Sequence, residues 1–163
     1  MGFSKSSENI NFHCDEARIR SRVGKKEISR AESKLIEALS TFDVDIDSYG
    51  KALDLGATPG GWSKVLADYG YEVLAVDPAL LDPVLKDYEN IKHIKTKAED
   101  LDLDEPLDLI VNDMNIGSKD TAQIMCEVKH LLKEGGLAIV IIKLPGNVRK
   151  SIEGGDLYFK RKV

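Results

Sequence analysis

Short apolar runs alternate with amphipathic stretches along most of this chain. The runs that favour buried strands cover residues 51–55, 72–76, 91–94, 107–111 and 137–142. Stretches with apolar positions at helical spacing cover residues 62–69, 79–87 and 119–133, and Gly135-Gly136 are expected to end the last helix. Such alternation, with nearly continuous apolar strands, is typical of parallel sheets covered on both faces. The pattern therefore predicts an α/β fold with a doubly wound, mainly parallel sheet.

A further helix is predicted before the first strand. It starts at the capping-box pattern Ser29-Arg30-Ala31-Glu32 and its apolar face continues to about Phe42. Lys34 lies near the edge of that face, so its side chain is expected to run along the body of the protein. Residues 1–27 lack periodicity and are expected to form a mobile basic arm, followed by a single domain over residues 28–163.

Charge is distributed unevenly over the 163 residues. The net charge of −5 combines +3 over residues 1–34, −12 over residues 35–142 and +4 over residues 143–163. The basic ends favour contact with a polyanion such as RNA, although a solvated tail explains the N-terminal charges equally well. The chain has no membrane-length apolar run, no signal peptide, and no metal-like spacing of Cys14, Cys126 or the histidines. We therefore expect a cytoplasmic protein with no membrane contact and no metal site.

The first predicted strand runs into a glycine-rich loop, Gly56-Ala57-Thr58-Pro59-Gly60-Gly61-Trp62, which opens a helix. Its three glycines allow positive φ and let a ligand approach the backbone. The unpaired N–H groups of the first helical turn suit a carboxylate or a phosphate. We therefore expect a small anionic or zwitterionic ligand here rather than an ordinary turn between a strand and a helix.

Four predicted strands carry a charged residue at or near their carboxyl ends: Asp54, Asp77, Asp113 and Lys143. Open parallel sheets bind ligands outside this edge, so these side chains are expected to line one crevice. Asp77 follows the first loop glycine by 21 positions, where an acid binds the hydroxyls of an adenosine ribose, although it could instead cap the next helix. Asp100, after the third strand, is a candidate for binding an adenine amino group or part of a solvated acidic loop.

The glycine spacing distinguishes between two ligands that contain adenosine. The loop has G-x-x-x-G-G with Pro59 inside, whereas dinucleotide-binding folds use G-x-G-x-x-G to bring a pyrophosphate to the helix. S-adenosylmethionine has an amino-acid end, a ribose and an adenine but no phosphate. It therefore suits this set of residues better than a dinucleotide.

Five segments, in this order, resemble the FtsJ-like (RrmJ-like) S-adenosylmethionine-dependent RNA 2′-O-methyltransferases. They are Ser29–Leu35, Asp54–Trp62, Val76-Asp77, Asn112–Met114 and Ile142–Pro145. The resemblance implies a Rossmann-like, doubly wound class I methyltransferase fold. Because only 20 residues follow Lys143, we expect this fold to be shortened at the C-terminus. The resemblance also implies methyl transfer from S-adenosylmethionine to a ribose 2′-hydroxyl of RNA, with S-adenosylhomocysteine as the product. The Lys-Leu-Pro ending resembles the branch that modifies large-subunit ribosomal RNA.

The resemblance also implies the site residues. The family uses a Lys-Asp-Lys-Glu tetrad, whose first three members fall on Lys34, Asp113 and Lys143. The expected cofactor-binding residues are Asp54, Gly56, Thr58, Pro59, Gly60, Gly61, Trp62, Asp77, Asp100 and Asp113. The glutamate has no clear equivalent, because only 20 residues follow Lys143 and Glu153 lies in a predicted turn.

A chemical role follows for each of the three tetrad residues. Lys143 would accept or direct the proton of the 2′-hydroxyl, Lys34 would supply a nearby positive charge, and Asp113 would orient both amines. Two other functions remain open at this point. One is a methyltransferase that acts on a small molecule or a protein, and the other is a domain that binds cofactor or RNA without turnover.

Overall fold

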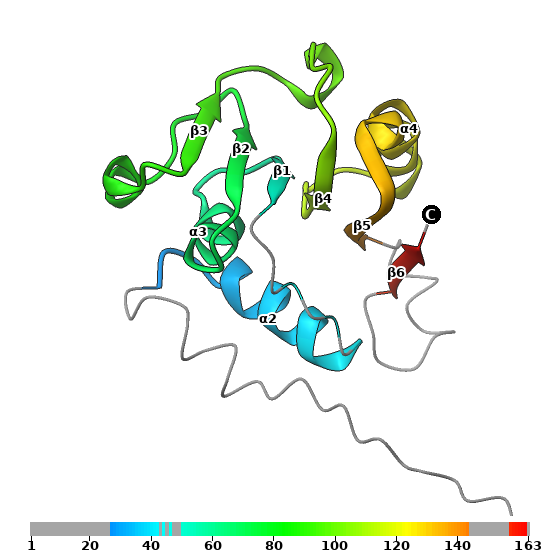
Figure 1. The fold of residues 1–163 in the computed structure, drawn as a ribbon, viewed down its shortest axis with the longest axis horizontal. Coiled ribbons are helices and arrows are strands. Elements are labelled where there is room, and N and C mark those ends of the chain that lie inside the picture. Colours follow the sequence, from blue (N-terminus) through cyan, green and yellow to red (C-terminus); the bar gives the residue numbers. More distant parts are fainter. Residues whose placement is uncertain (1–26, 43, 45, 47–49, 144–156, 163) are drawn as a thin grey trace, which may run out of the picture.

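The computed structural model describes residues 27–42, 44, 46, 50–143 and 157–162. Within these residues six strands form one sheet in the order β3-β2-β1-β4-β5-β6 (Figure 1). The strands are β1 (Lys51–Leu55), β2 (Glu72–Val76), β3 (Ile91–Ile94), β4 (Leu107–Asn112), β5 (Leu132–Ile142) and β6 (Leu157–Lys162). β1 to β5 are parallel, and β6 is antiparallel to β5. The predicted mainly parallel sheet is confirmed.

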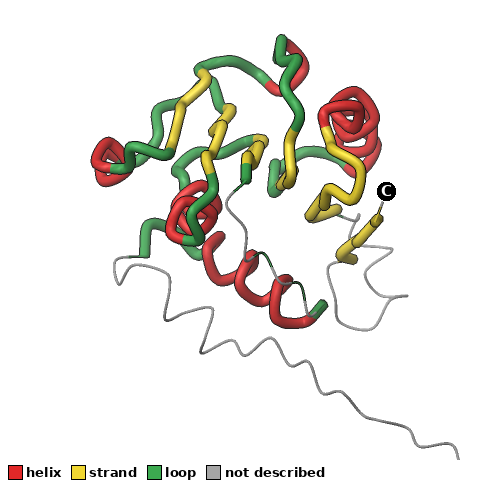
Figure 2. Tube along the Cα trace, viewed as in Figure 1, coloured by secondary structure: helices red, strands yellow, loops and turns green. Residues whose placement is uncertain are grey.

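Helices cover both faces of this sheet. α2 (Ala31–Thr41) and α3 (Gly61–Asp68) lie on one side, and α4 (Ser118–Val128) lies on the other (Figures 1 and 2). Three short 3-10 helices lie in the connections: η1 (Pro83–Asp87), η2 (Ala98–Asp100) and η3 (Lys129–Leu131). The arrangement is the two-sided covering that the apolar strand pattern predicts.

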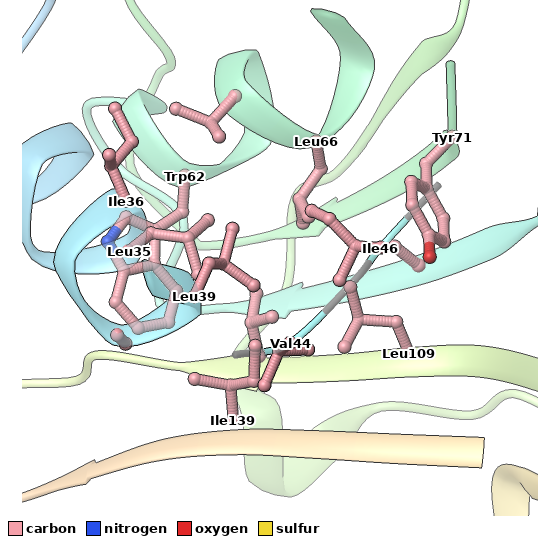
Figure 3. Packing of buried hydrophobic residues seen from close by; sticks show 14 of the residues in the cluster. Leu35, Ile36, Leu39, Val44, Ile46, Trp62, Leu66, Tyr71, Leu109 and Ile139 are labelled. Atoms are coloured by element: carbon pink, nitrogen blue, oxygen red, sulfur yellow. The ribbon is translucent and has the colours of Figure 1, made fainter. Parts of the chain in front are cut away.

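Alternating strand residues feed two separate hydrophobic cores. In β4, Leu109 and Val111 pack with α2 and α3, whereas Ile110 packs with α4. Figure 3 shows the first core, in which Leu35 and Leu39 of α2 lie close to Trp62 of α3 and to the sheet. Burial of each large aliphatic side chain contributes about 1.5–3 kcal/mol, so these contacts hold α2 and α3 on the sheet.

The prediction of a helix over residues 79–87 is wrong. Only the 3-10 helix η1 forms there, and the Asp82 side chain caps it by accepting a hydrogen bond from the N–H of Val84 at 2.9 Å. Pro83 explains the difference, because proline lacks an N–H group and disfavours helical backbone at the residue before it. Asp77 therefore caps no helix, although its carboxylate does bind the N–H of Ala79.

The predicted boundary between the last helix and the last parallel strand is also wrong. α4 ends at Val128 rather than Lys133, and β5 starts at Leu132 rather than Leu137. Gly135-Gly136 therefore lie inside β5 and do not end a helix. The register between β4 and β5 shifts at this point, and Gly135 has φ of 78°, which a glycine adopts without strain.

β6 is a strand that the sequence analysis did not predict. It runs antiparallel along β5, so that Leu157 pairs with Ile142 at one end and Lys162 pairs with Leu137 at the other. The arm expected over residues 1–27 lies almost entirely outside the described residues, and so does Glu153.

The strand order determines what lies along the carboxyl edge of the sheet. β2, β1, β4 and β5 are consecutive neighbours and all run in the same direction. Asp77, the glycine-rich loop, Asp113 and Lys143 follow these strands in that order. The topology alone therefore brings the predicted site residues to one edge.

Candidate active site

A carboxylate lies between two lysines at this edge. Asp113 directly follows β4, Lys34 extends from α2, and Lys143 directly follows β5. Lys34 Nζ donates hydrogen bonds to Asp113 Oδ2 at 2.9 Å and to Oδ1 at 3.2 Å. Lys143 Nζ lies 3.9 Å from Asp113 Oδ1. The structure thus brings together the three residues that the sequence assigns to the first three tetrad positions.

The helix that carries Lys34 is held against the start of α3. Trp62 Nε1 donates a hydrogen bond to the carbonyl oxygen of Ala31 at 2.6 Å. A Cβ atom on Gly61 would collide with Ser29 Oγ and lie 3.1 Å from Glu32 Cγ. Glycine at position 61 therefore allows α2 to pack directly on the glycine-rich loop.

A buried charge cluster joins the same two helices. Lys64 Nζ of α3 lies 3.1 Å from Asp68 Oδ2 and 3.5 Å from Glu32 Oε2 of α2. Glu32 also accepts a hydrogen bond from the N–H of Ser29, as the capping-box pattern predicts. Tyr88 donates a hydrogen bond to Asp68 at 3.0 Å, and burial together with this bond raises the pKa of Tyr88 to about 12.

Asn112 and Met114 fix the loop that carries Asp113. Asn112 is fully buried, and its Oδ1 accepts a hydrogen bond from the N–H of Met114 at 2.9 Å. Its Nδ2 lies 3.7 Å from the sulfur of Met125 on α4. The Met114 side chain packs on Gly56, where an added Cβ would lie 2.5 Å from Met114 Cγ. The loop is therefore held between the glycine-rich loop and α4.

Protein atoms, rather than open space, lie beside three glycines of the loop. At Gly60, which has φ of 111°, an added Cβ would collide with Leu85 of η1. The carbonyl oxygen of Pro59 accepts a hydrogen bond from the N–H of Asp82 at 2.9 Å. The close approach seen at Gly56, Gly60 and Gly61 is between protein segments, and the approach of a ligand to this loop stays a prediction.

Asp77 connects the loops that follow β1 and β2. Its Oδ2 accepts a hydrogen bond from the N–H of Thr58 at 3.1 Å, and its Oδ1 accepts one from the N–H of Ala79 at 2.8 Å. His93 Nε2 of β3 lies 2.9 Å from the carbonyl oxygen of Asp77. Each carboxylate oxygen can accept a second hydrogen bond, so Asp77 retains acceptor capacity for a ligand hydroxyl.

Asp54 and Trp62 lie inside the protein rather than on the surface of a crevice. Asp54 is 2% exposed, and Ser63 Oγ donates a hydrogen bond to its Oδ2 at 2.6 Å. Burial raises the pKa of Asp54 to about 7, and the charges of Asp113 and Asp77 add to this effect. Trp62 is 3% exposed and packs in the core (Figure 3). The expectation that all four strand-end charges line one crevice is therefore wrong for Asp54.

Asp100 is the last residue of η2 and is exposed. Among the described residues, its carboxylate makes no hydrogen bond or ion pair with Asp77 or with the glycine-rich loop. Its proposed contact with an adenine amino group stays a prediction.

The carboxyl edge carries three carboxyl groups together with the ammonium groups of Lys34 and Lys143. Asp54, Asp77 and Asp113 are close enough for the latter two to disfavour ionisation of the first. In the part of the chain that the structure describes, no cluster of three metal-ligating side chains occurs. Nor is any helix of that part suited in length and apolarity to crossing a bilayer.

Two hollows of about 450 Å³ each lie at the opposite edge, around the first residues of β1 and β2. Four of their charged groups are paired within the protein. Lys51 pairs with Glu105, and Lys133 Nζ lies 2.9 Å from Asp108 Oδ1. Partial burial would raise the pKa of Asp108, but hydrogen bonds from Lys133 and from the N–H of Lys51 hold it below its usual range. These pairs connect strand starts and are far from Asp113 along the strands.

A family model described as FtsJ-like methyltransferase matches residues 28–150. This chain belongs to the FtsJ-like methyltransferase family. It is 34% identical over 132 residues to ribosomal RNA large subunit methyltransferase E of a Wolbachia strain, covering 70% of this chain and 59% of that protein. It is 38% identical over 101 residues to ribosomal RNA large subunit methyltransferase M of Aeromonas hydrophila, covering 58% of this chain and 27% of that protein.

Solved structures confirm the class I methyltransferase fold of this family member. Fibrillarin, a pre-rRNA processing protein of Methanococcus jannaschii, aligns with a TM-score of 0.55 at 25% identity, over 76% of this chain and 62% of that one. The FtsJ-like chain thus spans less than two thirds of the length of each of these three relatives.

Asn115 beside Lys143, and Lys64 between the helices that flank the candidate site, make contacts that the sequence did not predict. Lys143 Nζ donates a hydrogen bond to Asn115 Oδ1 at 3.1 Å, and Lys64 is buried between α2 and α3. The only sequence signal for Lys64 is a lysine inside an apolar helical stretch. No sequence signal marks Asn115.

Proposed function

We propose that this FtsJ-like chain transfers a methyl group from S-adenosylmethionine to a ribose 2′-hydroxyl of RNA, with ribosomal RNA as the substrate class. The observation that carries the proposal is Asp113 lying between Lys34 and Lys143 at the carboxyl edge of the sheet. Ligands of open α/β sheets bind outside this edge. The same edge carries the glycine-rich loop and Asp77, so cofactor and proton-handling groups would be neighbours.

The residues present fit S-adenosylmethionine better than a dinucleotide. Its sulfonium and its amino group are positively charged, and the carboxylates of Asp77 and Asp113 at this edge would favour them. Asp77 has remaining acceptor capacity for the ribose hydroxyls, and the glycine-rich loop would hold the amino-acid end. Asp54 would act from beneath the loop, through its hydrogen bond with Ser63 at the start of α3.

The lysines would align the 2′-hydroxyl and take its proton. When bound, S-adenosylmethionine supplies a methyl group that is already reactive, so alignment and proton handling are the main tasks of the protein. Lys34 occupies both oxygens of Asp113 and balances its charge. Lys143, at 3.9 Å, faces a carboxylate that is already paired and is the amine we assign to the hydroxyl proton.

Ribosomal RNA is proposed because the relatives in the FtsJ-like family carry that substrate in their names. The positive charge of Lys34 and Lys143 beside the reacting position would also attract the phosphates that flank the target ribose. Their side chains are 40% and 28% exposed, so both can reach a substrate.

The proposal is tested with labelled S-adenosylmethionine and unmodified large-subunit ribosomal RNA made by transcription. A 2′-O-methyl group blocks alkaline cleavage at its own nucleotide, so we expect label in alkali-resistant dinucleotides. Calorimetry with S-adenosylmethionine is run in parallel. Cofactor binding without transfer would indicate a binding domain. Label in protein or in small molecules, with none in RNA, would indicate a different methyltransferase.

A further inference from the structure

We propose that Asn115 is a positioning residue for Lys143, and that its side-chain oxygen holds the amine toward the reacting hydroxyl. This inference rests on the proposed function, because it assigns Lys143 a part in methyl transfer. Asn115 lies outside the residues that the resemblance to the FtsJ-like family assigns to catalysis or cofactor binding.

The distances single out Asn115 as the closer partner of Lys143. Lys143 Nζ donates a hydrogen bond to Asn115 Oδ1 at 3.1 Å, whereas the nearest oxygen of Asp113 lies at 3.9 Å. The distance to Asp113 is too long for a hydrogen bond. Asp113 directs both its oxygens to Lys34 instead. The two lysines thus have different partners, although they share one carboxylate.

The backbone around Asn115 is held in place by buried neighbours. Asn112 binds the N–H of Met114 from within the sheet, and Met114 packs on Gly56. Asn115 follows directly, two positions after Asp113, and α4 begins at Ser118. A short loop fixed at these points can present Asp113 and Asn115 to the same amine in a constant geometry.

An amide is suited to this role because it carries no charge. Its oxygen accepts a hydrogen bond from a charged or a neutral amine, so it orients Nζ in both protonation states. A second carboxylate at this place would favour the ammonium form, in which Lys143 cannot accept a proton. The charged groups facing Lys143 from the described elements are Asp113 after β4 and, beyond it, Lys34 on α2.

The test compares Asn115→Asp and Asn115→Ala with the unchanged chain. Asn115 is exposed, so both variants are expected to fold. Gln123→Ala is the matched control, because Gln123 is an exposed amide on α4 whose partner Glu127 belongs to the same helix. The first readout is the pH titration of the Lys143 side chain, which is measured by NMR of ¹³C-labelled lysine in the presence of S-adenosylhomocysteine.

We expect Asn115→Asp to shift this titration to higher pH by about half a unit to one unit, since a partly exposed carboxylate acts weakly. Gln123→Ala should titrate like the unchanged chain. Identical titration of Lys143 in Asn115→Asp and the unchanged chain would overturn the inference. This readout needs no RNA, so it stands even where the chain fails to methylate RNA and the proposed function falls.

The second readout is the rate of methyl transfer as a function of pH. The rising part of the profile should move to higher pH in Asn115→Asp by the same amount as the titration. Asn115→Ala should lower kcat about 10- to 100-fold with little change in KM for S-adenosylmethionine, because the amine loses its orientation. Equal kcat in Asn115→Ala and Gln123→Ala would also overturn the inference.

Discussion

Asp54 is the last residue but one of β1 and Asp113 follows the neighbouring β4, but their surroundings differ at the scale of the single residue. Asp54 is 2% exposed, and its Oδ2 accepts a hydrogen bond from the neutral hydroxyl of Ser63. Asp113 binds the ammonium group of Lys34 through both oxygens. Burial without a cation favours the protonated form of Asp54, whereas Asp113 has a cation to balance its charge. Two aspartates of one edge therefore have different tasks.

Asp54 makes the stability of the protein depend on pH in a specific direction. Its pKa rises from 3.8 to about 7 on folding, so between these values the folded chain binds more protons than the unfolded chain. The contribution of Asp54 to stability is therefore present below pH 4 and is lost as pH rises towards 7. Each pH unit in this range lowers the free energy of unfolding by up to about 1.4 kcal/mol.

Asp54→Asn keeps an acceptor for Ser63 but cannot ionise. We expect the variant to unfold at higher denaturant concentration than the unchanged chain at pH 8, and the difference to shrink by pH 5. Urea unfolding at several pH values measures this. Asp102→Asn, on an exposed position, is the control. A difference that stays constant from pH 5 to pH 8 would contradict the raised pKa.

At the scale of elements, the contact between α2 and α3 decides where Lys34 lies. The contact includes the Trp62–Ala31 hydrogen bond, the glycine at position 61 and the ion pair of Lys64 with Glu32. None of these residues touches Asp113 in the described structure. Each of them nevertheless acts on the site, because α2 carries the amine that pairs with this carboxylate.

Gly61→Ala should push α2 away from α3, since the new methyl group collides with Ser29. We expect a loss of about 1–3 kcal/mol in the free energy of unfolding, as for other overpacked sites. Ser29→Gly should recover part of this loss when combined with Gly61→Ala in a double-mutant cycle. Gly117→Ala is the control, because its φ of −65° suits any residue. Additive effects of the two substitutions would contradict the predicted collision.

Lys64→Met should be more damaging than most substitutions in this chain. It removes the cation between the buried carboxylate of Glu32 and the partly buried carboxylate of Asp68. Breaking a buried ion pair in this way costs about 3–5 kcal/mol. Denaturant unfolding measures the loss, with Lys129→Met on an exposed position as the control. A loss equal to that of the control would show that the cluster contributes little to stability.

At the scale of the whole molecule, strong local patterns were sufficient to predict the sheet. The bounds of β1, β2 and β3 agree with the sequence prediction because short apolar runs end at glycine, proline or charged residues there. The convergence of Asp113 with Lys34 and Lys143 was predictable from strand ends and the family resemblance. The periodicity over residues 79–87 predicts a helix that does not form, because Pro83 lacks an N–H group and disfavours helical backbone before it.

Features that depend on contacts between distant segments were out of reach of the sequence pattern. β6 forms because β5 has an edge free for pairing. The short apolar run Leu157–Phe159 is not sufficient by itself to predict a strand. The Asn115–Lys143 hydrogen bond joins residues 28 positions apart, and neither residue type requires the other. Protein atoms fill the space beside three loop glycines for the same reason, since glycine permits close approach without specifying the partner.

The most direct test of the central claim is methyl transfer by Lys143→Ala, measured in a single turnover on an RNA that the unchanged chain methylates. We expect binding of S-adenosylmethionine within about threefold of the unchanged chain and a methyl-transfer rate lowered at least about 100-fold, as for loss of a proton-transfer group. Lys129→Ala, exposed at the end of α4, should retain the full rate. An unchanged rate in Lys143→Ala would contradict the assignment of the carboxyl edge as the catalytic site.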